Sequence, residues 1–370
     1  MTRRLRYAWL VVLAGAALPA AARAQSGGRE FLSGVEFRSL SFDSGLAAKK
    51  VSEFVIPVGM VWAVNPRVSL DFGTQLARAS STNPSGASAT ISGLTDTQAR
   101  LVYQVRPDVV AFTLSANLPT GTTELSDPQL AVAGVIAEDL IPYPVSSFGT
   151  GASVTTGLAV AVPVNGWAIG IGGSYRMSGT YRLATSDSVN SHFKPGAEMR
   201  LRVGMDRLVG QGRVSLGLTY SSFANDQFGG QQLAPGNRYI PEASWNAPVA
   251  GMNVAVYGWD VYRASGTATA SNAPSDEQNL LALGAAGTIQ RGRNQWRPMV
   301  EYRRDWVSTG GSLAAAGTML SFGLRYAMVA GERMTLVPGL RFDTGNIVGP
   351  AGSGVGYRGL SGSVSVRTSW

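Results

Sequence analysis

The chain holds one histidine and no cysteine, so the side chains that most often carry out chemistry are scarce. His192 lies just after Asp187 and Ser188, and a histidine with a serine or an aspartate is the minimum that a hydrolase needs. One histidine without a partner at a fixed spacing is a weak catalytic signal and favours a solvated loop residue. The chain shows neither clustered transition-metal ligands nor a glycine motif that binds phosphate. We therefore expect no enzyme, no metal and no cofactor, with a membrane-embedded hydrolase that uses His192 as the alternative.

Arginine recurs on the polar face of several extended segments. In residues 198–206, Arg200 and Arg202 alternate with apolar side chains, and alternation places them on one face of a strand. The same register assigns further arginines to polar faces: Arg100, Arg106, Arg176, Arg213, Arg297, Arg303, Arg325, Arg341 and Arg367. The acids that share these faces are Asp71, Glu198, Asp206, Glu301, Asp305 and Asp343.

Two interpretations fit this basic surface. The charges pair across neighbouring strands and stabilise a water-filled interior, or the surplus arginines form a filter that favours anions. Both interpretations can hold together, because arginines can remain in excess after the charges on neighbouring strands have paired. The candidate selectivity residues are Arg100, Arg176, Arg200, Arg202, Arg213, Arg303, Arg325 and Arg341.

The elements that would position these residues are long amphipathic strands. Alternation continues for about ten residues or more in many segments, which suits tilted strands that cross a membrane. In water, such long apolar faces would need a matching core. We predict an all-β fold, a transmembrane antiparallel β-barrel of about sixteen strands, with fourteen as the alternative. The predicted strands are 31–42, 49–64, 67–79, 91–106, 109–120, 148–163, 167–182, 193–208, 212–224, 237–246, 252–264, 278–290, 296–307, 313–329, 333–344 and 356–370.

Four prolines complicate this assignment. Pro241 makes 237–246 the weakest predicted strand. Pro57, Pro298 and Pro338 also fall inside predicted strands, where a residue without an N–H cannot donate to the ladder. They indicate β-bulges or misplaced strand boundaries.

Aromatic residues support a membrane barrel. Trp296 and Trp306 lie ten residues apart on one strand face, about 25 Å along the axis of a tilted strand, which suits two interfacial girdles. Trp370 is an aromatic residue at the end of an alternating strand. Such a C-terminus resembles the signal that the barrel assembly machinery of the outer membrane recognises. Outer-membrane lipid, lipopolysaccharide and this machinery are therefore the expected partners.

The N-terminus is typical of a secretory signal peptide. Three arginines precede an apolar run from Tyr7 to Leu18, and Ala22-Arg23-Ala24 offers a cleavage site. We predict a cleaved signal at 1–24 and a barrel at 25–370, in the bacterial outer membrane. Four of the 31 basic residues belong to the signal, so the net charge of +8 overstates the mature value. No basic run with interleaved aromatic residues predicts nucleic-acid binding.

The longest connection, residues 121–147, contains a helix signal. Ser126 can cap a helix and Pro128 suits its first turn, while Pro142 and Pro144 end it, which predicts a helix near 127–140. Its apolar residues must be buried, and we favour burial in the mouth of the barrel. The expected constriction residues are Leu130, Val135, Ile136 and Leu140.

Three short motifs point to a family. Residues 93–97 (GLTDT) open one strand, residues 118–121 (LPTG) close the next, and residues 148–151 (FGTG) open a third. This order resembles the outer-membrane proteins of the meta-pathway of phenol degradation, which are related to hydrophobic-compound and fatty-acid transporters. The resemblance covers residues 90–182 and implies a barrel that carries small, aromatic or apolar molecules inward. The N-terminal plug of the fatty-acid transporters has no counterpart here, since only Gln25 to Glu30 precede the first predicted strand.

Together these observations predict a channel for passive uptake of a small-molecule solute, whether an aromatic or hydrophobic compound or an anion. A closed structural or adhesive barrel, with its lumen filled by paired side chains, is a further alternative to the His192 hydrolase.

Overall fold

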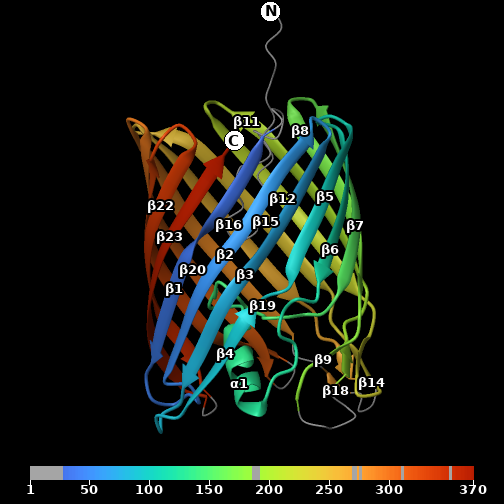
Figure 1. The fold of residues 1–370 in the computed structure, drawn as a ribbon, viewed down its shortest axis with the longest axis vertical. Coiled ribbons are helices and arrows are strands. Elements are labelled where there is room, and N and C mark those ends of the chain that lie inside the picture. Colours follow the sequence, from blue (N-terminus) through green and yellow to red (C-terminus); the bar gives the residue numbers. More distant parts are fainter. Residues whose placement is uncertain (1–27, 186–191, 269–272, 275–276, 310–311, 350–351) are drawn as a thin grey trace, which may run out of the picture.

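The computed structural model describes residues 28–185, 192–268, 273–274, 277–309, 312–349 and 352–370, so the predicted signal at 1–24 lies outside the described residues. Within them the chain forms a closed barrel of sixteen antiparallel strands (Figure 1). The wall strands are β1 (Arg29–Phe42), β2 (Lys50–Asn65), β3 (Val68–Thr82), β4 (Ser88–Leu94) with β5 (Thr97–Arg106), β6 (Val110–Leu118), β7 (Ser153–Val164), β8 (Trp167–Ser178), β11 (Glu198–Val209), β12 (Gly212–Phe223), β15 (Arg238–Val249), β16 (Met252–Arg263), β19 (Gln278–Arg291), β20 (Asn294–Thr309), β21 (Ser312–Val329), β22 (Met334–Val348) and β23 (Gly354–Ser369).

Each wall strand pairs with the next along the chain, and β23 pairs with β1 to close the barrel. β4 and β5 both pair with β3, so they are two halves of one strand that is interrupted at Thr95 and Asp96. The strands tilt strongly against the barrel axis, as closure requires. Among the described residues, no helix is long and apolar enough to cross a bilayer.

The two ends of the barrel differ in their connections. Tight turns join the strands at one end, for example Asn165-Gly166, where both residues have positive φ (49° and 81°). We call this the turn end, and the opposite end, which carries the long connections, the loop end. The C-terminus lies at the turn end (Figure 1).

Apolar side chains cover the outside of the barrel. Met199, Leu201, Val203 and Met205 alternate along β11 and are each 42–50% exposed. Their neighbours Arg200 and Arg202 point the other way and bind carboxylates of the inner face. Such exposure of large apolar residues along whole strands is expected of a surface that faces hydrocarbon, because in water these faces would collapse together.

Pro57, Pro241, Pro298 and Pro338 cause neither bulges nor strand ends in the wall, so the expectation of bulges or misplaced boundaries there was wrong. On one flank each proline keeps its register partner; Pro57 lies opposite Gln75 and Pro298 opposite Leu324. On the other flank the ladder skips two pairs without any register shift, as it does between Ser33–Val58 and Glu36–Val55. Pro241 and Pro338 follow the same pattern. A missing N–H removes bonds to one neighbour only, and the second neighbour holds the register.

A second sheet extends the wall at the loop end. Six short strands form it: β9 (Tyr181–Arg182), β10 (His192–Lys194), β13 (Asp226–Phe228), β14 (Gln231–Ala234), β17 (Thr267–Ala268) and β18 (Ala273–Pro274). They prolong the hairpins β8–β11, β12–β15 and β16–β19, so the sheet continues beyond the wall strands on that side of the loop end (Figure 1). The predicted strands 167–182 and 193–208 were therefore too long, since their outer ends belong to this sheet.

Candidate functional site

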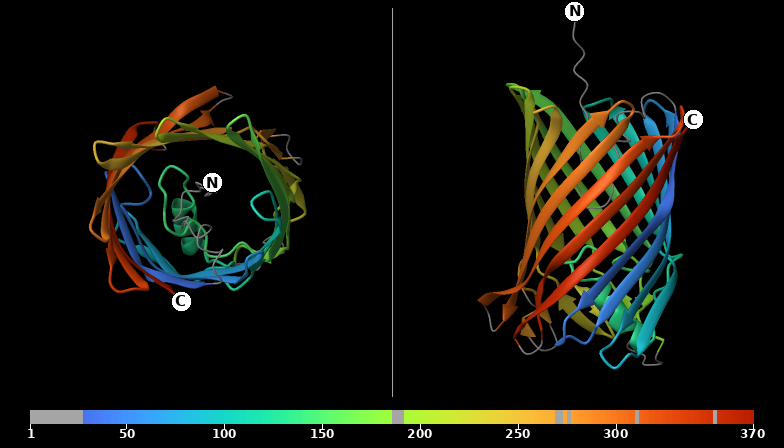
Figure 2. Two further views of the ribbon diagram at one scale, coloured as in Figure 1. Left: turned by 90° about the horizontal axis from the view of Figure 1, so that it is seen from above. Right: turned by 90° about the vertical axis from the view of Figure 1, so that its left-hand side faces the viewer.

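The connection between β6 and β7 enters the barrel instead of extending outward. We define the inner segment as residues 121–150, which contain helix α1 (Asp127–Ile136). Viewed along the axis, α1 lies inside the ring of strands (Figure 2). The helix is shorter than the predicted 127–140: the Ala137 N–H still bonds to the Ala133 carbonyl, and the chain then leaves helical geometry.

A single carboxylate holds both ends of the inner segment. Asp96 lies at the interruption between β4 and β5, where one extra residue relative to β3 bends the strand. It accepts bonds from the backbone N–H groups of Gly121 (3.0 Å) and Thr150 (2.6 Å) and from the Asn117 amide (2.8 Å). A Cβ at Gly121 would lie 2.0 Å from the Phe148 carbonyl oxygen, so only glycine fits there. The three motifs of the family resemblance therefore meet at this one cluster.

Local sequence explains why α1 forms and which side it buries. Gln129 Oε1 accepts a bond from the Ser126 N–H (2.9 Å), and its amide donates to the Thr90 carbonyl of β4 (3.2 Å). The first bond gives the Ser126 N–H at the start of the helix an acceptor, and the second attaches the helix to β4 of the wall. Val132 and Ile136 are fully buried.

The inner segment packs on an apolar patch of the inner wall near the loop end. Leu140 and Ile141 are almost fully buried, and Leu130 and Val135 pack partly buried against the same cluster. The wall contributes the following buried side chains: Leu40, Val51, Val55, Ala77, Ala79, Ile91, Leu280, Met319 and Tyr357. The four residues expected at a constriction thus pack within this cluster against the wall, and their role in narrowing the lumen stays a prediction. The bulk of a barrel interior is polar, so this patch is built to receive the inner segment.

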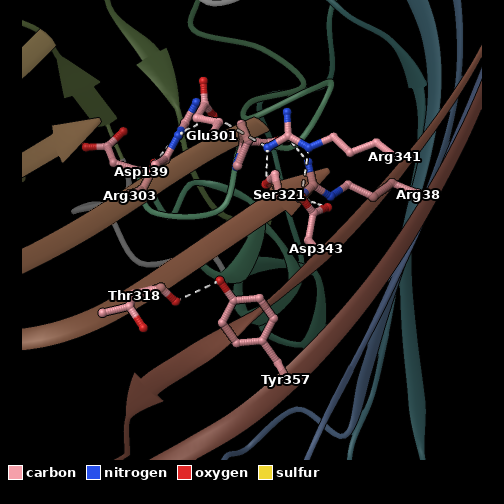
Figure 3. Close-up of polar contacts among 10 residues, drawn as sticks. Arg38, Asp139, Glu301, Arg303, Thr318, Ser321, Arg341, Asp343 and Tyr357 are labelled. Atoms are coloured by element: carbon pink, nitrogen blue, oxygen red, sulfur yellow. Dashed lines mark hydrogen bonds and ion pairs between the residues drawn. The ribbon is translucent and has the colours of Figure 1, made fainter. Parts of the chain in front are cut away.

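Buried charges lie beneath the inner segment (Figure 3). Asp343 is fully buried and accepts bonds from Arg38 Nη2 (2.8 Å), Arg341 Nε (2.7 Å) and the Ser321 hydroxyl (2.5 Å). Arg38 also donates to the Pro142 carbonyl of the inner segment and lies over the Tyr143 ring. Asp343 and the two arginines thus compensate one another's charge, which buried charges need to be tolerated.

A second group of charges extends this network across the barrel. Arg303 donates to Glu301 (2.9 Å) and to the Asp139 carbonyl (3.3 Å), while Tyr257 donates to the other oxygen of Glu301 (2.9 Å). The Asp139 carboxylate lies 3.9 Å from Arg263 of β16. On the opposite side, the Val145 N–H donates to Glu53 of β2 (3.1 Å). The inner segment is therefore bonded to walls on both sides of the lumen.

Most of the arginines proposed for selectivity form ion pairs within the described residues. The pairs join Arg100 to Asp71, Arg200 to Glu198, Arg202 to Glu242, Arg213 to Asp206, Arg303 to Glu301 and Arg341 to Asp343. Arg325 lies opposite Arg297 near the turn end, and Arg176 lies opposite Glu198 near the loop end. The structure thus spreads these arginines over the whole length of the lumen and does not gather them at one level.

A cavity of about 780 Å³ remains beside the inner segment at the loop end. Glu138 of the inner segment bounds it on one side, and β8, β11, β12, β15 and β16 bound it on the other. Burial, followed by the charges of Asp305 and Asp139, raises the pKa of Glu138 above 4.5. Burial also raises the pKa of Asp226 in the second sheet, although the Gly196 N–H bond opposes this effect. Both carboxyl groups therefore hold a proton more readily than in water.

The remaining predicted residues lie away from the cavity. Trp296 is 40% exposed and stacks on Tyr326 near the turn end, and Trp306 lies under the Arg304 guanidinium near the loop end. Trp370 is exposed and bonds through its backbone to Arg29. His192 is exposed in β10 opposite Arg182, while Asp187 and Ser188 lie outside the described residues.

Several residues of the site were not predicted from the sequence. Arg38 and Glu53 occupy inward positions, each next to one exposed phenylalanine (Phe37 and Phe54), so the alternation that identified the other arginines applies to them too. Arg238 and Arg263 lie at strand ends, where the register was uncertain. From the sequence, Asp96 stands out only as part of a motif, because a contact to residues 121 and 150 has no local sequence signal.

No family model and no curated protein matches the chain. Solved structures do resemble it. OprB of Pseudomonas putida is 10% identical, with 95% of this chain and 96% of that chain covered and a TM-score of 0.51. The CymD monoaromatic hydrocarbon channel is 10% identical over 95% of this chain and 91% of its own, with a TM-score of 0.45. The anion-selective porin from Comamonas acidovorans is 12% identical over 92% and 98%, with a TM-score of 0.43.

The likeness to OprB concerns the fold. Together with the closed sixteen-strand wall and its apolar outer face, it makes this chain an outer-membrane β-barrel protein of the bacterial outer membrane.

Proposed function

We propose that this protein is a channel through which small solutes cross the outer membrane passively. The inner segment fills part of the lumen, and the cavity of about 780 Å³ beside it supports this proposal most directly. A channel needs a wet, polar interior with a defined narrow point, and an inner segment bonded to the wall provides one. The loop end would face the cell exterior, since long loops are extracellular in such barrels.

The solute class follows from two separate features. The resemblance at residues 90–182 implies aromatic or apolar molecules, while the arginine-rich lumen favours anions. Neither feature requires a solute-driven cycle or an energy source, so we infer diffusion down a gradient. We propose no catalytic role for His192, which is exposed in β10 opposite Arg182.

Conductance in a planar bilayer tests the channel. Purified protein should give stepwise currents in potassium chloride, with reversal potentials that favour chloride. Replacing residues 127–146 with a short Gly-Ser linker should raise the single-channel conductance, because the remaining wall encloses a wider lumen. Absence of steps in both forms, together with no uptake of small solutes by liposomes, would refute the proposal.

A closed structural barrel is the second candidate. The observation that favours it is the buried network around Asp343, which fixes the inner segment as firmly as a permanent plug would be fixed. The same measurement separates the two candidates. A silent parent protein whose linker variant conducts would indicate a barrel that the inner segment keeps shut.

A further inference from the structure

A row of charged residues follows the hydrogen-bond register along the part of the inner wall that bounds the cavity. Arg176 lies opposite Glu198, and Arg238 lies directly opposite Arg263, which in turn faces Gln278. All of these side chains line the cavity. Like charges directly opposite each other on neighbouring strands repel, so Arg238 and Arg263 together form a locally positive surface.

The protein compensates only part of this charge. Asp139 lies 3.9 Å from Arg263, and Glu198 is bonded by Arg200 (2.7 Å). Among the described residues, neither Arg176 nor Arg238 has an ion-pair partner, and the Nε atom of each is buried without an acceptor. A buried donor needs an acceptor, and an anion can provide one to a guanidinium through two parallel bonds.

The same cavity has apolar walls. Phe193, Phe223, Leu233 and Val307 line it beside the arginines. The Phe223 ring lies 5.6 Å from the Arg238 guanidinium and holds that group over its face. A ligand that reached Arg238 would therefore have its body against aromatic and aliphatic side chains.

The acidic residues of the cavity oppose an anion weakly. Glu138 faces Asp139 of its own segment and Asp305 of β20, and Asp226 bonds to the Gly196 N–H. Burial makes both carboxyl groups easier to protonate. Glu198 has its charge matched by Arg200, so it adds little net negative potential.

We propose that this cavity is a binding site for a small organic anion that carries one carboxylate-like group on an apolar, ring-sized body. Arg238 and Arg176 bind the charged group, and Phe193 and Leu233 contact the body. This inference rests on the proposed channel and names its preferred solute class: neutral hydrocarbons lack the charge, and inorganic anions lack the apolar surface.

Calorimetric titration of the full-length protein in detergent tests the site with three probes. Benzoate has both features, benzyl alcohol lacks the charge, and acetate lacks the ring. Benzoate should bind at least tenfold more tightly than either of the others. Arg238→Gln should weaken benzoate binding by about tenfold or more, since charged hydrogen bonds are lost. Arg78→Gln, the same change on the outward face of β3, should leave it unaffected.

The outcomes separate the site from the channel. Equal affinity for benzoate and acetate, or an Arg238→Gln protein that binds as the parent does, overturns the site even if the barrel conducts. Benzoate binding, with no conductance steps in the parent or the linker variant and no uptake of small solutes by liposomes, overturns the channel and leaves the site in place. Arg176→Gln serves as a second variant should Arg238→Gln fail to form a heat-resistant barrel, and it too must weaken benzoate binding.

Discussion

Glu138 is the residue through which pH should reach the cavity. It lies between the buried Ile136 and Leu140 of the inner segment, and burial, followed by the nearby charges of Asp305 and Asp139, raises its pKa above 4.5. A raised pKa means that the carboxyl group becomes neutral at a higher pH than a free glutamate does. The cavity therefore loses a negative charge while ordinary exposed carboxylates remain ionised.

The anion preference of the channel should accordingly increase as the pH falls from 8 towards 5. Protonation of Glu138 removes repulsion beside Arg263 and Arg238, so the reversal potential in a salt gradient should move towards that of chloride. Glu138→Gln should be more anion-selective than the parent at pH 8 and should show a smaller change with pH. Asp226 retains part of the response, since its pKa is also raised. If the reversal potentials of the parent and of Glu138→Gln change with pH in the same way, this assignment is wrong.

Asp96 should control the order of the inner segment. Asp96→Ala removes the acceptor for the Gly121 and Thr150 N–H groups, and each bond to a charged group contributes about 1.5–3 kcal/mol. We expect faster hydrogen exchange in residues 121–150 and noisier single-channel currents. Asp71→Ala is the matched control, because Asp71 pairs with Arg100 on the wall and has no bond to the inner segment. Equal hydrogen exchange in Asp96→Ala and Asp71→Ala would contradict the role of Asp96 in holding the two ends of the inner segment.

At the scale of elements, alternation in the sequence was sufficient to find the sixteen wall strands. Side chains of a barrel strand meet either lipid or lumen, so apolar and polar residues must alternate along its length. Strand 237–246 illustrates the point. Its apolar and polar residues alternate on both sides of Pro241, and the structure confirms it as β15. The helix was also predicted, because capping residues and prolines are local signals.

Features that depend on distant contacts were not predictable. The six short strands of the second sheet contain only two to four residues each, which is too short for any period to show. The interruption at Asp96 depends on β3, and the side on which the cavity remains depends on how the inner segment packs. These features arise from tertiary packing, which has no local period in the sequence.

Packing of α1 against the wall should fix the width of the lumen. Ile136 is fully buried, and Ile136→Ala creates a cavity that typically costs about 2–5 kcal/mol. That cost falls on the attachment of the inner segment, because the wall strands keep their own ladder. We expect larger and more variable conductance with an unchanged melting temperature of the barrel. Val135→Ala, at a partly buried position, should have a smaller effect. A barrel that melts earlier without a change in conductance would contradict this separation.

At the scale of the whole molecule, the bilayer decides which substitutions are tolerated. Val203 lies near the middle of β11 and is 50% exposed on the outer face, whereas Ser215 of β12 faces the lumen opposite Asp206. Val203→Arg should reduce the free energy of folding into vesicles by about 2–4 kcal/mol. Ser215→Arg should change it little, because the new charge meets water and a carboxylate. Equal losses in the two variants, measured by equilibrium folding into vesicles, would show that the assignment of faces is wrong.

The attachment of both ends of the inner segment to Asp96 has a consequence for how such proteins diversify. Insertions, deletions or an entirely different sequence between Gly121 and Thr150 leave the strand register untouched, because the two junctions remain side by side. The wall of the barrel can thus stay constant while the residues between the two junctions are replaced. Selection can then change which compounds enter a cell without having to rebuild the wall that lets the protein insert.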